Sequence, residues 1–473
     1  MLAKAIERGA LWLLAAWRDL ALDAKVIGAL GLGNAALLIA NHTTVQATAD
    51  APLWRLFPSL AGPLWLLLCA ISAGLYPYRD RRHGAGFTTR DRWLHLAGIV
   101  LLFAVVPTIA SIVLRETGRP YTYVHDGAIM VEEAARKLLA GHNPYATDYL
   151  DTPLYYWPMV NNPALYHLTY FPFLFLVTTP FVWIFDRVGL FWDQRYLYLP
   201  AYLAALAVLP SLLPHTAQRL ALVALVGLNP QLFPFVVEGR NDFFVLAFLF
   251  AGIALVQHER RGLGALAIAV AGAVKLHALF LLPFLLVYYV AHPRPGHTRP
   301  RDLRGLWSAL IRPFLPAAAF LAVTFVPFLA ADFPAFYDDV VRYNAGGAAW
   351  SYPISGMGFS AILLALGIIP NPQADFPFAA VEIAVAAPVA VYFLRRLWRT
   401  PSLALMLGGY ALTLLAFLFF GRYFQGNYLG YILAVASPIV FLTGAFSGSR
   451  ARRRVEGSRS SARSGRTAMK PRT

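Results

Sequence analysis

The chain of 473 residues is poor in cysteine and in charge. Its single cysteine, Cys69, excludes a disulfide within the chain and a cysteine-based metal site. Charged side chains make up 14% of the residues, whereas a soluble domain carries about a quarter. Apolar residues reach 58%, and the mean hydropathy is +0.56. This composition excludes an ordinary soluble domain and indicates a polytopic membrane protein.

Other common signals are missing as well. Residues 1–25 interleave charged with apolar residues and so lack the apolar core of a cleavable signal; we expect an amphipathic helix at the cytoplasmic membrane interface. No segment repeats with a period of roughly 20 to 50 residues. No paired-aspartate motif is present, because Asp148 with Asp151 and Asp338 with Asp339 are typical of solvated loop acids. We therefore expect neither a metal nor another cofactor.

Mostly apolar stretches of about fifteen to twenty-one residues recur between residues 26 and 446, which suits helices that cross a bilayer. Many contain Gly or Pro, as bundled membrane helices tolerate. The sequence therefore predicts an all-α, polytopic transmembrane bundle of about eleven to thirteen helices for residues 26–446.

Positive charge is concentrated in short clusters, so the net charge of +16 does not require a nucleic-acid partner. The tail, residues 447–473, is predicted to be disordered and held to anionic lipid headgroups. If the positive clusters face the cytoplasm, two loops, 115–165 and 332–352, face outward. The remaining clusters are Arg79, Arg81, Arg82, Arg90 and Arg92; Arg260 and Arg261; Arg294, Arg299, Arg301 and Arg304; and Arg395, Arg396 and Arg399.

One crossing conflicts with this topology. Counting apolar stretches places residues 238–242 in the cytoplasm, whereas the Arg260 and Arg261 cluster one helix later places them outside. We follow the charge cluster and expect Pro172 and Pro180 to break the stretch 166–185 into a re-entrant hairpin. By the same rule, residues 353–369 should not cross the membrane.

The loop 115–165 contains a predicted short helix along the membrane surface. Asp126 occupies its N-cap position and Gly141 its C′ position. An apolar stripe falls at helical spacing on Val131, Ala134, Ala135, Leu138 and Leu139. The opposite face should carry i, i+4 ion pairs, namely Glu132 with Arg136 and Glu133 with Lys137.

Two interpretations of Asp126 are compatible with each other. The residue can cap this helix, for which aspartate is well suited. It can also serve as a general base, and burial near the hydrocarbon boundary would raise its pKa toward that role. Residues after the helix could contact a sugar: Asn143, Tyr145, Tyr156 and Trp157. An interfacial aromatic belt explains the last two equally well.

Several motifs together carry a family resemblance. An outer loop begins with an early Asp126 and continues through a helix into Gly141-His142-Asn143-Pro144-Tyr145; Gly239-Arg240-Asn241-Asp242-Phe243 and Lys275-Leu276-His277 follow. This pattern, over about residues 94–290, resembles the GT-C membrane glycosyltransferases. It is most similar to the polyprenyl-phosphate-mannose-dependent α-mannosyltransferases of bacteria.

The resemblance implies a function. Asp126 matches the family's base, which deprotonates the acceptor hydroxyl. One hexose, expected to be mannose, would pass with inversion from a polyprenyl-phosphate donor to a glycolipid or polysaccharide acceptor outside the plasma membrane. The late loop Gly421–Asn427 contains no histidine, although some relatives place a catalytic histidine there. That departure argues against a histidine-assisted step.

A lipid-phosphate donor requires a cation for its leaving phosphate. Lys275 lies in the apolar run 267–284, where an ionised side chain needs a partner. The alternative is that Lys275 snorkels, or pairs with Asp242 or Glu238 for packing alone. His277, Arg240 and Arg422 are further candidates for the phosphate.

Glu238 and Asp242 either line the sugar pocket or only begin a helix. If they belong to the site, one charged group of residues 238–242 should lie within about two side-chain lengths of Lys275, with aromatic rings nearby. Two other classes remain open, a transporter or flippase of a lipid-linked sugar and a non-catalytic scaffold. A transporter is expected to show paired repeats. A scaffold would not require Asp126, Lys275 and residues 238–242 to converge.

Overall fold

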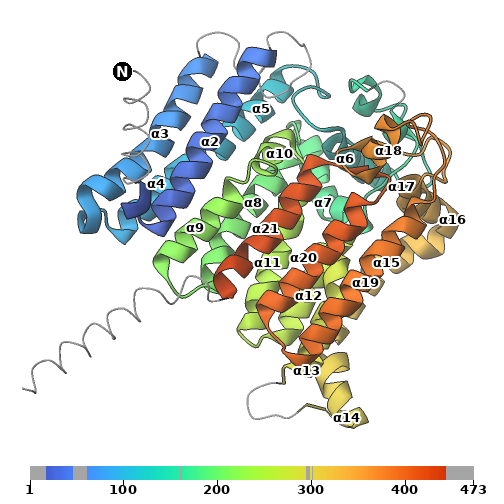
Figure 1. Ribbon diagram of the computed structural model, residues 1–473. Coiled ribbons are helices and arrows are strands. Elements are labelled where there is room, and N and C mark those ends of the chain that lie inside the picture. Colours follow the sequence, from blue (N-terminus) through green and yellow to red (C-terminus); the bar gives the residue numbers. More distant parts are fainter. Residues whose placement is uncertain (1–16, 46–60, 160–161, 294–298, 301, 444–473) are drawn as a thin grey trace, which may run out of the picture.

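The computed structural model describes residues 17–45, 61–159, 162–293, 299–300 and 302–443 (Figure 1). Within these ranges the chain is almost entirely helical, and its strands are two short parallel ones, β1 (Ser355–Gly356) and β2 (Tyr423–Phe424). The predicted all-α bundle is therefore confirmed. Most of the predicted N-terminal amphipathic helix and the whole predicted disordered tail lie outside the described residues.

The helices form four successive groups along the chain. The first group is α2 (Leu22–Val45), α3 (Ala61–His83), η1 (Gly84–Gly86), α4 (Thr89–Val100), η2 (Leu101–Val105) and α5 (Val106–Thr117). A layer of α6 (Asp126–Leu139), η3 (Pro153–Tyr156), η4 (Pro163–Leu165) and α7 (Pro172–Val188) follows. The third group is α8 (Arg195–Val208), η5 (Leu209–Leu212), α9 (Thr216–Gly227), α10 (Phe233–Glu238), α11 (Asp242–Gln257), α12 (Arg261–Val274), η6 (Leu276–Leu281) and α13 (Leu282–Ala291). The last is α14 (Leu303–Leu306), η7 (Trp307–Ile311), α15 (Arg312–Ala331), α16 (Phe333–Tyr337), η8 (Asp338–Arg342), α17 (Tyr343–Ala345), α18 (Phe359–Ala365), α19 (Phe378–Arg399), α20 (Leu403–Phe419) and α21 (Gly426–Leu442).

Five helical stretches in the described part are long and apolar enough to span a membrane, and shorter apolar helices pack beside them. The five are Leu22–Ala40, Thr89–Thr117, Arg195–Leu212, Leu303–Ala331 and Phe378–Arg399. Prolines inside α8, α15 and α19 leave these helices continuous, as neighbouring helices in a bundle allow. The chain is thus a multi-pass membrane protein. Eleven to thirteen crossings remain a prediction.

Close packing of α11 against α12 forms the centre of the bundle. A Cβ atom added to Gly252 would lie 2.6 Å from Ile268 Cγ1, and one added to Gly264 would lie 2.7 Å from Val256 Cγ2. Both glycines therefore let the two helix backbones approach, as small residues do between membrane helices. This contact matters for the site, because Asp242 begins α11 and Lys275 directly follows α12.

The predicted re-entrant hairpin at residues 166–185 is wrong in its form. The segment from Pro172 continues as one helix, α7, with Pro172 at its first turn and Pro180 inside. A proline at the first turn of a helix removes no intrahelical hydrogen bond, and bundled helices tolerate an internal one. Nothing in the local chemistry therefore requires a break.

The chain nevertheless enters and leaves α7 at the same end of the bundle. It packs along α6, and near its end Asp186 pairs with Arg136 of α6 at 3.2 Å. The next helix, α8, begins at Arg195, which donates to the carbonyls of Tyr123 and Val237. Residues 238–242 consequently lie at the same end of the bundle as the loop 115–165, which holds Asp126, as the charge cluster indicated, although α7 lies along the layer instead of folding back. That this end faces outward stays a prediction.

The segment 353–369 forms only β1 and the seven-residue helix α18. Seven residues rise about 10 Å, well short of a bilayer core of about 30 Å. The expectation that this segment does not cross is confirmed.

The segments that carry three of the arginine clusters meet at the opposite end of the bundle. Arg261 donates to the carbonyls of Tyr289 and His292 where α12 begins and α13 ends. Arg299 donates to the Ala291 carbonyl at 3.0 Å and lies 5.6 Å from the ring centroid of Trp398 on α19. Three clusters that are distant in sequence therefore share one end, as the positive-inside rule predicts.

Candidate functional site

Asp126 is the first residue of α6, and His125 is the N-cap. The prediction that Asp126 is the N-cap is wrong by one residue, because the extended backbone conformation falls on His125. The C-terminal prediction is confirmed. Gly141 has φ +84, its N–H donates to the Leu138 carbonyl, and the N–H of His142 donates to that of Lys137, which is a Schellman motif.

Two groups hold the Asp126 carboxylate. Its Oδ1 lies 2.7 Å from His125 Nδ1 and accepts a hydrogen bond of 2.7 Å from the Gly127 N–H. Burial favours the neutral acid, but His125, the Gly127 N–H and the charge of Arg240 outweigh it and lower the pKa of Asp126. The predicted rise in pKa is therefore wrong, because the sequence does not reveal these partners. The side chain retains 14% exposure.

The segment 238–242 lies directly against this loop. The His125 N–H donates to the Glu238 carbonyl at 2.7 Å, which joins the two chain segments at the backbone. Arg240 Nε donates to the Glu238 carboxylate at 3.0 Å, and its guanidinium carbon lies 4.3 Å from the ring centroid of Phe235. Arg240 is thus a partly exposed cation beside Asp126, and its guanidinium packs against the ring of Phe235.

Lys275 lies on the other side of Arg240. Its Nζ donates to Asp242 Oδ1 at 2.7 Å, while Asp242 Oδ2 accepts from Asn427 at 2.9 Å. Asn427 also approaches Arg240, with its Oδ1 3.4 Å from NH1. The ring of Tyr428 lies 5.2 Å from Lys275 Nζ. The expected proximity of residues 238–242 to Lys275, with an aromatic ring beside it, is therefore observed; we call Asp126, Glu238, Arg240, Asp242, Lys275 and Asn427 the charged cluster.

A break in a helix positions Lys275. Helix α12 ends at Val274, and Lys275 has the extended angles φ −151 and ψ 133 before η6 continues. A cation at a helix C-terminus is stabilised by the helix dipole. His277 lies in η6, where it is 7% exposed, packs edge-on against Tyr428 at 4.9 Å, and has no partner for Nδ1. His277 therefore adjoins the cluster beneath Tyr428.

Tyrosines from distant segments surround the cluster. Burial and then the charge of Asp126 raise the pKa of Tyr170 and of Tyr352, while Arg240 acts in the opposite direction on both. Tyr352 lies 4.7 Å from Tyr423, which in turn lies 6.0 Å from Tyr428, measured between ring centroids. The stretches near residues 170, 352 and 423–428 thus meet around Asp126 and Lys275. The sequence carries no signal for this, because no periodic pattern links the three stretches.

The other predicted substrate residues divide by position. Trp157 donates to the Val124 carbonyl at 2.9 Å, and its ring lies 5.9 Å from that of His125, so it adjoins the cluster. Tyr145 is buried and donates to the Tyr170 carbonyl at 2.8 Å, and the Asn143 side chain accepts from the Tyr145 N–H. Both therefore support the loop. Tyr156 is 63% exposed and is not brought to the cluster.

Arg422 has its donors committed elsewhere. It is buried and donates to the carbonyls of Tyr352, Ala374 and Pro372 at 2.7, 3.2 and 3.4 Å. A guanidinium occupied in this way ties loops together and has little capacity left for a phosphate.

The polar face predicted for α6 is wrong. Glu132 is 2% exposed and accepts hydrogen bonds from NH1 and NH2 of Arg115, at 2.9 and 2.6 Å. Glu133 pairs with Arg136 at i, i+3 spacing, and Lys137 pairs with Asp151. The helix is covered on almost every side, so the i, i+4 pairs do not form. The predicted apolar stripe is buried at Val131, Ala134 and Ala135, whereas Leu139 is exposed.

Asp339 is also not a solvated loop acid. It is 4% exposed, its Oδ1 lies 2.7 Å from His167 Nδ1, and its Oδ2 accepts from the Leu168 N–H at 2.9 Å. This contact joins the segment that directly follows the loop 115–165 to the loop 332–352. Asp148 and Asp151 are exposed, as predicted.

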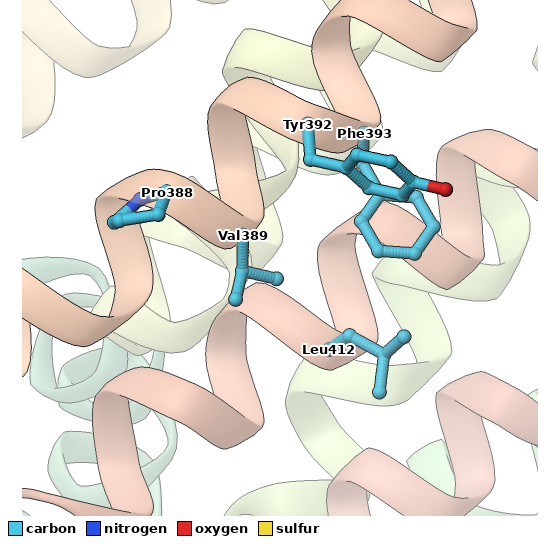
Figure 2. A pocket seen from close by; sticks show the side chains of 5 residues that line it. All are labelled: Pro388, Val389, Tyr392, Phe393 and Leu412. Atoms are coloured by element: carbon cyan, nitrogen blue, oxygen red, sulfur yellow. The ribbon is translucent and has the colours of Figure 1, made fainter.

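Two other features bear on ligand binding. Within the described ranges, no group of three or more His, Cys, Asp or Glu side chains could hold a metal ion. An apolar hollow lies between α19 and α20, lined by Pro388, Val389, Tyr392, Phe393 and Leu412 (Figure 2). None of these side chains belongs to the charged cluster, and none carries a charge for a phosphate.

Comparison with known proteins finds one family that part of the chain resembles. Residues 119–291 match the family model described as alpha-(1->6)-mannopyranosyltransferase, N-terminal domain. The chain resembles the GT-C type mannosyltransferases, as predicted. The matched segment runs from before Asp126 to the end of α13 and therefore contains five of the six cluster residues, all except Asn427. No curated protein and no solved structure matches the chain. The family indicates α-mannosyltransferase activity for this mannosyltransferase-like membrane protein.

Proposed function

We propose that the protein transfers mannose from a polyprenyl-phosphate-mannose to a hydroxyl group of a glycolipid or polysaccharide, on the outer face of the plasma membrane. The observation that carries this proposal is the charged cluster at one end of a membrane bundle, which holds three carboxylates and two cations within one family-matched segment. A lipid-phosphate donor at the membrane surface requires this combination of charges.

The proposed reaction divides the roles between the two sides of the cluster. Asp126 accepts the proton of the acceptor hydroxyl as its oxygen bonds to C1 of the mannose. The bond between C1 and the phosphate oxygen breaks, and the electron pair leaves with the polyprenyl phosphate. Lys275 and Arg240 stabilise the negative charge on that phosphate. Attack on the face opposite the leaving group inverts the anomeric configuration.

The lowered pKa of Asp126 keeps its carboxylate ionised at neutral pH, but it also makes Asp126 a weaker base than the raised pKa expected from the sequence would. The carboxylate is therefore available as a base at neutral pH, and it becomes protonated only in clearly acidic solution. His125 and Gly127 also fix its direction.

Replacing Asp126 with Asn tests the proposal. The amide retains hydrogen-bonding groups but cannot take the proton, so we expect turnover to fall by about 10²-fold or more while thermal stability stays near normal. The assay follows transfer from a synthetic polyprenyl-phosphate mannose to an alkyl α-mannoside by mass spectrometry, which also identifies the new linkage. Near-normal transfer by folded Asp126→Asn protein would reduce Asp126 to a structural residue.

The rival function is transport of the same lipid-linked sugar. A transporter moves the lipid-linked sugar between two compartments and forms no glycosidic bond. Purified protein in detergent has no second compartment, so a transporter would leave the donor unchanged there. Formation of product in detergent by the unaltered protein therefore supports the transferase and opposes the transporter.

A further inference from the structure

A buried charge network adjoins the cluster, and none of its side chains takes part in the proposed reaction. It consists of Arg115 on α5, Glu132 on α6, Asp193, and Arg195 at the start of α8, and each of these side chains is at most 2% exposed. Arg115 NH1 bridges Glu132 and Asp193 at 2.9 and 2.8 Å. The two cations and two anions balance, as buried ions require.

Arg195 binds Asp193 through two of its guanidinium nitrogens and binds backbone carbonyls outside the network through the third, NH1. Its Nε and NH2 grip both oxygens of Asp193 at 2.8 and 2.7 Å, which directs the guanidinium. Its NH1 donates to the carbonyls of Tyr123 and Val237 at 2.7 and 2.9 Å. Tyr123 stands three residues before Asp126, and Val237 stands three residues before Arg240.

The backbone at these contacts adopts conformations that need support. Tyr123 has φ +58, a left-handed conformation that costs a non-glycine residue free energy. Gly239 has φ +85, and a Cβ added to it would lie 3.2 Å from Arg195 Cγ. The aliphatic part of Arg195 therefore packs against Gly239, while its guanidinium binds both the segment at Tyr123 and the segment at Val237.

We propose that Arg195 is a positioning residue that fixes the segments 123–126 and 237–240 against each other and thereby aims Asp126 at the acceptor beside Arg240. A guanidinium directed by a bidentate carboxylate can serve two carbonyls at once, whereas a lysine ammonium cannot reproduce this fork. The inference rests on the proposed function for its kinetic consequence, but the joining of the two segments can be tested without activity.

The first test measures hydrogen exchange by mass spectrometry in Arg195→Lys. The His125 amide donates to the Glu238 carbonyl, so its exchange should become at least about tenfold faster when the segments loosen. Arg261→Lys is the matched control, because Arg261 is also buried and donates to two backbone carbonyls, at the other end of α12. Unchanged exchange at His125 in Arg195→Lys would overturn the inference whether or not the protein transfers mannose.

The second test is a double-mutant comparison. Since Arg195 acts through Asp126, Arg195→Lys should lower kcat about 10- to 100-fold in the unaltered protein, but less than about threefold in an Asp126→Asn background. A merely structural role predicts the same fold-loss in both backgrounds. Absence of transfer by the unaltered protein would defeat the proposed function and leave the exchange test to decide.

Gly239→Ala is a second variant for the same two tests, to be used if Arg195→Lys does not fold. The added Cβ presses on Arg195 and strains a backbone with φ +85, while every partner of the network is retained. It should reproduce faster exchange at His125 and the same dependence on Asp126. Wild-type exchange in a folded Gly239→Ala protein would contradict the proposal.

Discussion

Lys275 illustrates how one side chain combines packing with a possible role toward substrate. Its partner Asp242 is 1% exposed, so removing the lysine alone leaves a buried charge without a cation. Loss of one partner of a buried pair costs about 3–5 kcal/mol. A single substitution therefore cannot separate the two roles.

We predict different outcomes for two variants of this pair. Asp242→Asn keeps the cation and should still bind a polyprenyl phosphate near-normally. Lys275→Met with Asp242→Asn removes both charges, should fold, and should bind that ligand at least about tenfold more weakly. Binding and melting temperature are measured together. Equal affinity in the two variants would assign Lys275 to packing.

The His167–Asp339 pair gives a prediction about pH. Although burial opposes it, hydrogen bonds to Asp339 and to the Ala349 carbonyl raise the pKa of His167, and Asp338 lies 3.9 Å away. A base whose folded pKa is raised contributes stability below its ordinary pKa and loses it as pH rises through the folded value. Burial raises the pKa of Asp339 to about 6, so both partners are charged only above that value. The melting temperature of the unaltered protein should therefore exceed that of His167→Gln more at pH 6.5 than at pH 9. An equal difference at both pH values would contradict a charged His167.

At the scale of helices, the α11–α12 contact sets the distance between Asp242 and Lys275. A Cβ on Gly252 would lie 2.6 Å from Ile268 and 3.0 Å from the Gly264 carbonyl, whereas one on Gly262 meets only the Pro313 carbonyl at 3.8 Å. A Gly→Ala substitution therefore has space at Gly262 and none at Gly252.

We predict that Gly252→Ala lowers the free energy of unfolding by about 1–3 kcal/mol, because the helices must separate. Gly262→Ala should be neutral or stabilising by up to about 1 kcal/mol, through helix propensity. Thermal unfolding in detergent measures both, and donor binding should weaken only in Gly252→Ala. An unchanged free energy of unfolding in Gly252→Ala would show that α11 and α12 can separate at little cost, and would contradict the prediction.

At the scale of the whole molecule, the positive clusters and the charged cluster occupy opposite ends of the bundle (Figure 1). From the positive-inside rule we predict that the site faces the outside of the cell. Thr147 lies in the loop layer near the site, whereas Gly84 and Thr400 follow α3 and α19 at the arginine-rich end.

Single cysteines test this orientation in a Cys69→Ala background. An impermeant thiol reagent should label Thr147→Cys in intact cells and should label Gly84→Cys and Thr400→Cys only after the membrane is opened. The predictions for Gly296 and Ser458, which lie outside the described residues, are the same as for Gly84. Labelling of Thr400→Cys with protection of Thr147→Cys would reverse the orientation and place the site inside.

The sequence alone determined the features that depend on composition and on local spacing. Apolar runs specified a helical membrane bundle, and the arginine clusters put residues 238–242 on the side of the loop that holds Asp126, where counting helices failed. Gly141 was assigned to its helix end because a left-handed residue there favours glycine. The nearness of Asp242 to Lys275 followed from the need to pair a charge within an apolar run.

Only the tertiary structure decided the partners of individual charges. The predicted ion pairs of Glu132 and Glu133 failed because α6 is covered on nearly all sides, and long-range contacts with Arg115 replaced the local pair at Glu132. The pKa of Asp126 falls instead of rising because His125, Gly127 and Arg240 surround its carboxylate. Arg195 lies about seventy residues from the loop it supports. Spacing along a chain reports neighbours on one helix, whereas these contacts depend on how separate helices pack, and that is a property of the folded bundle.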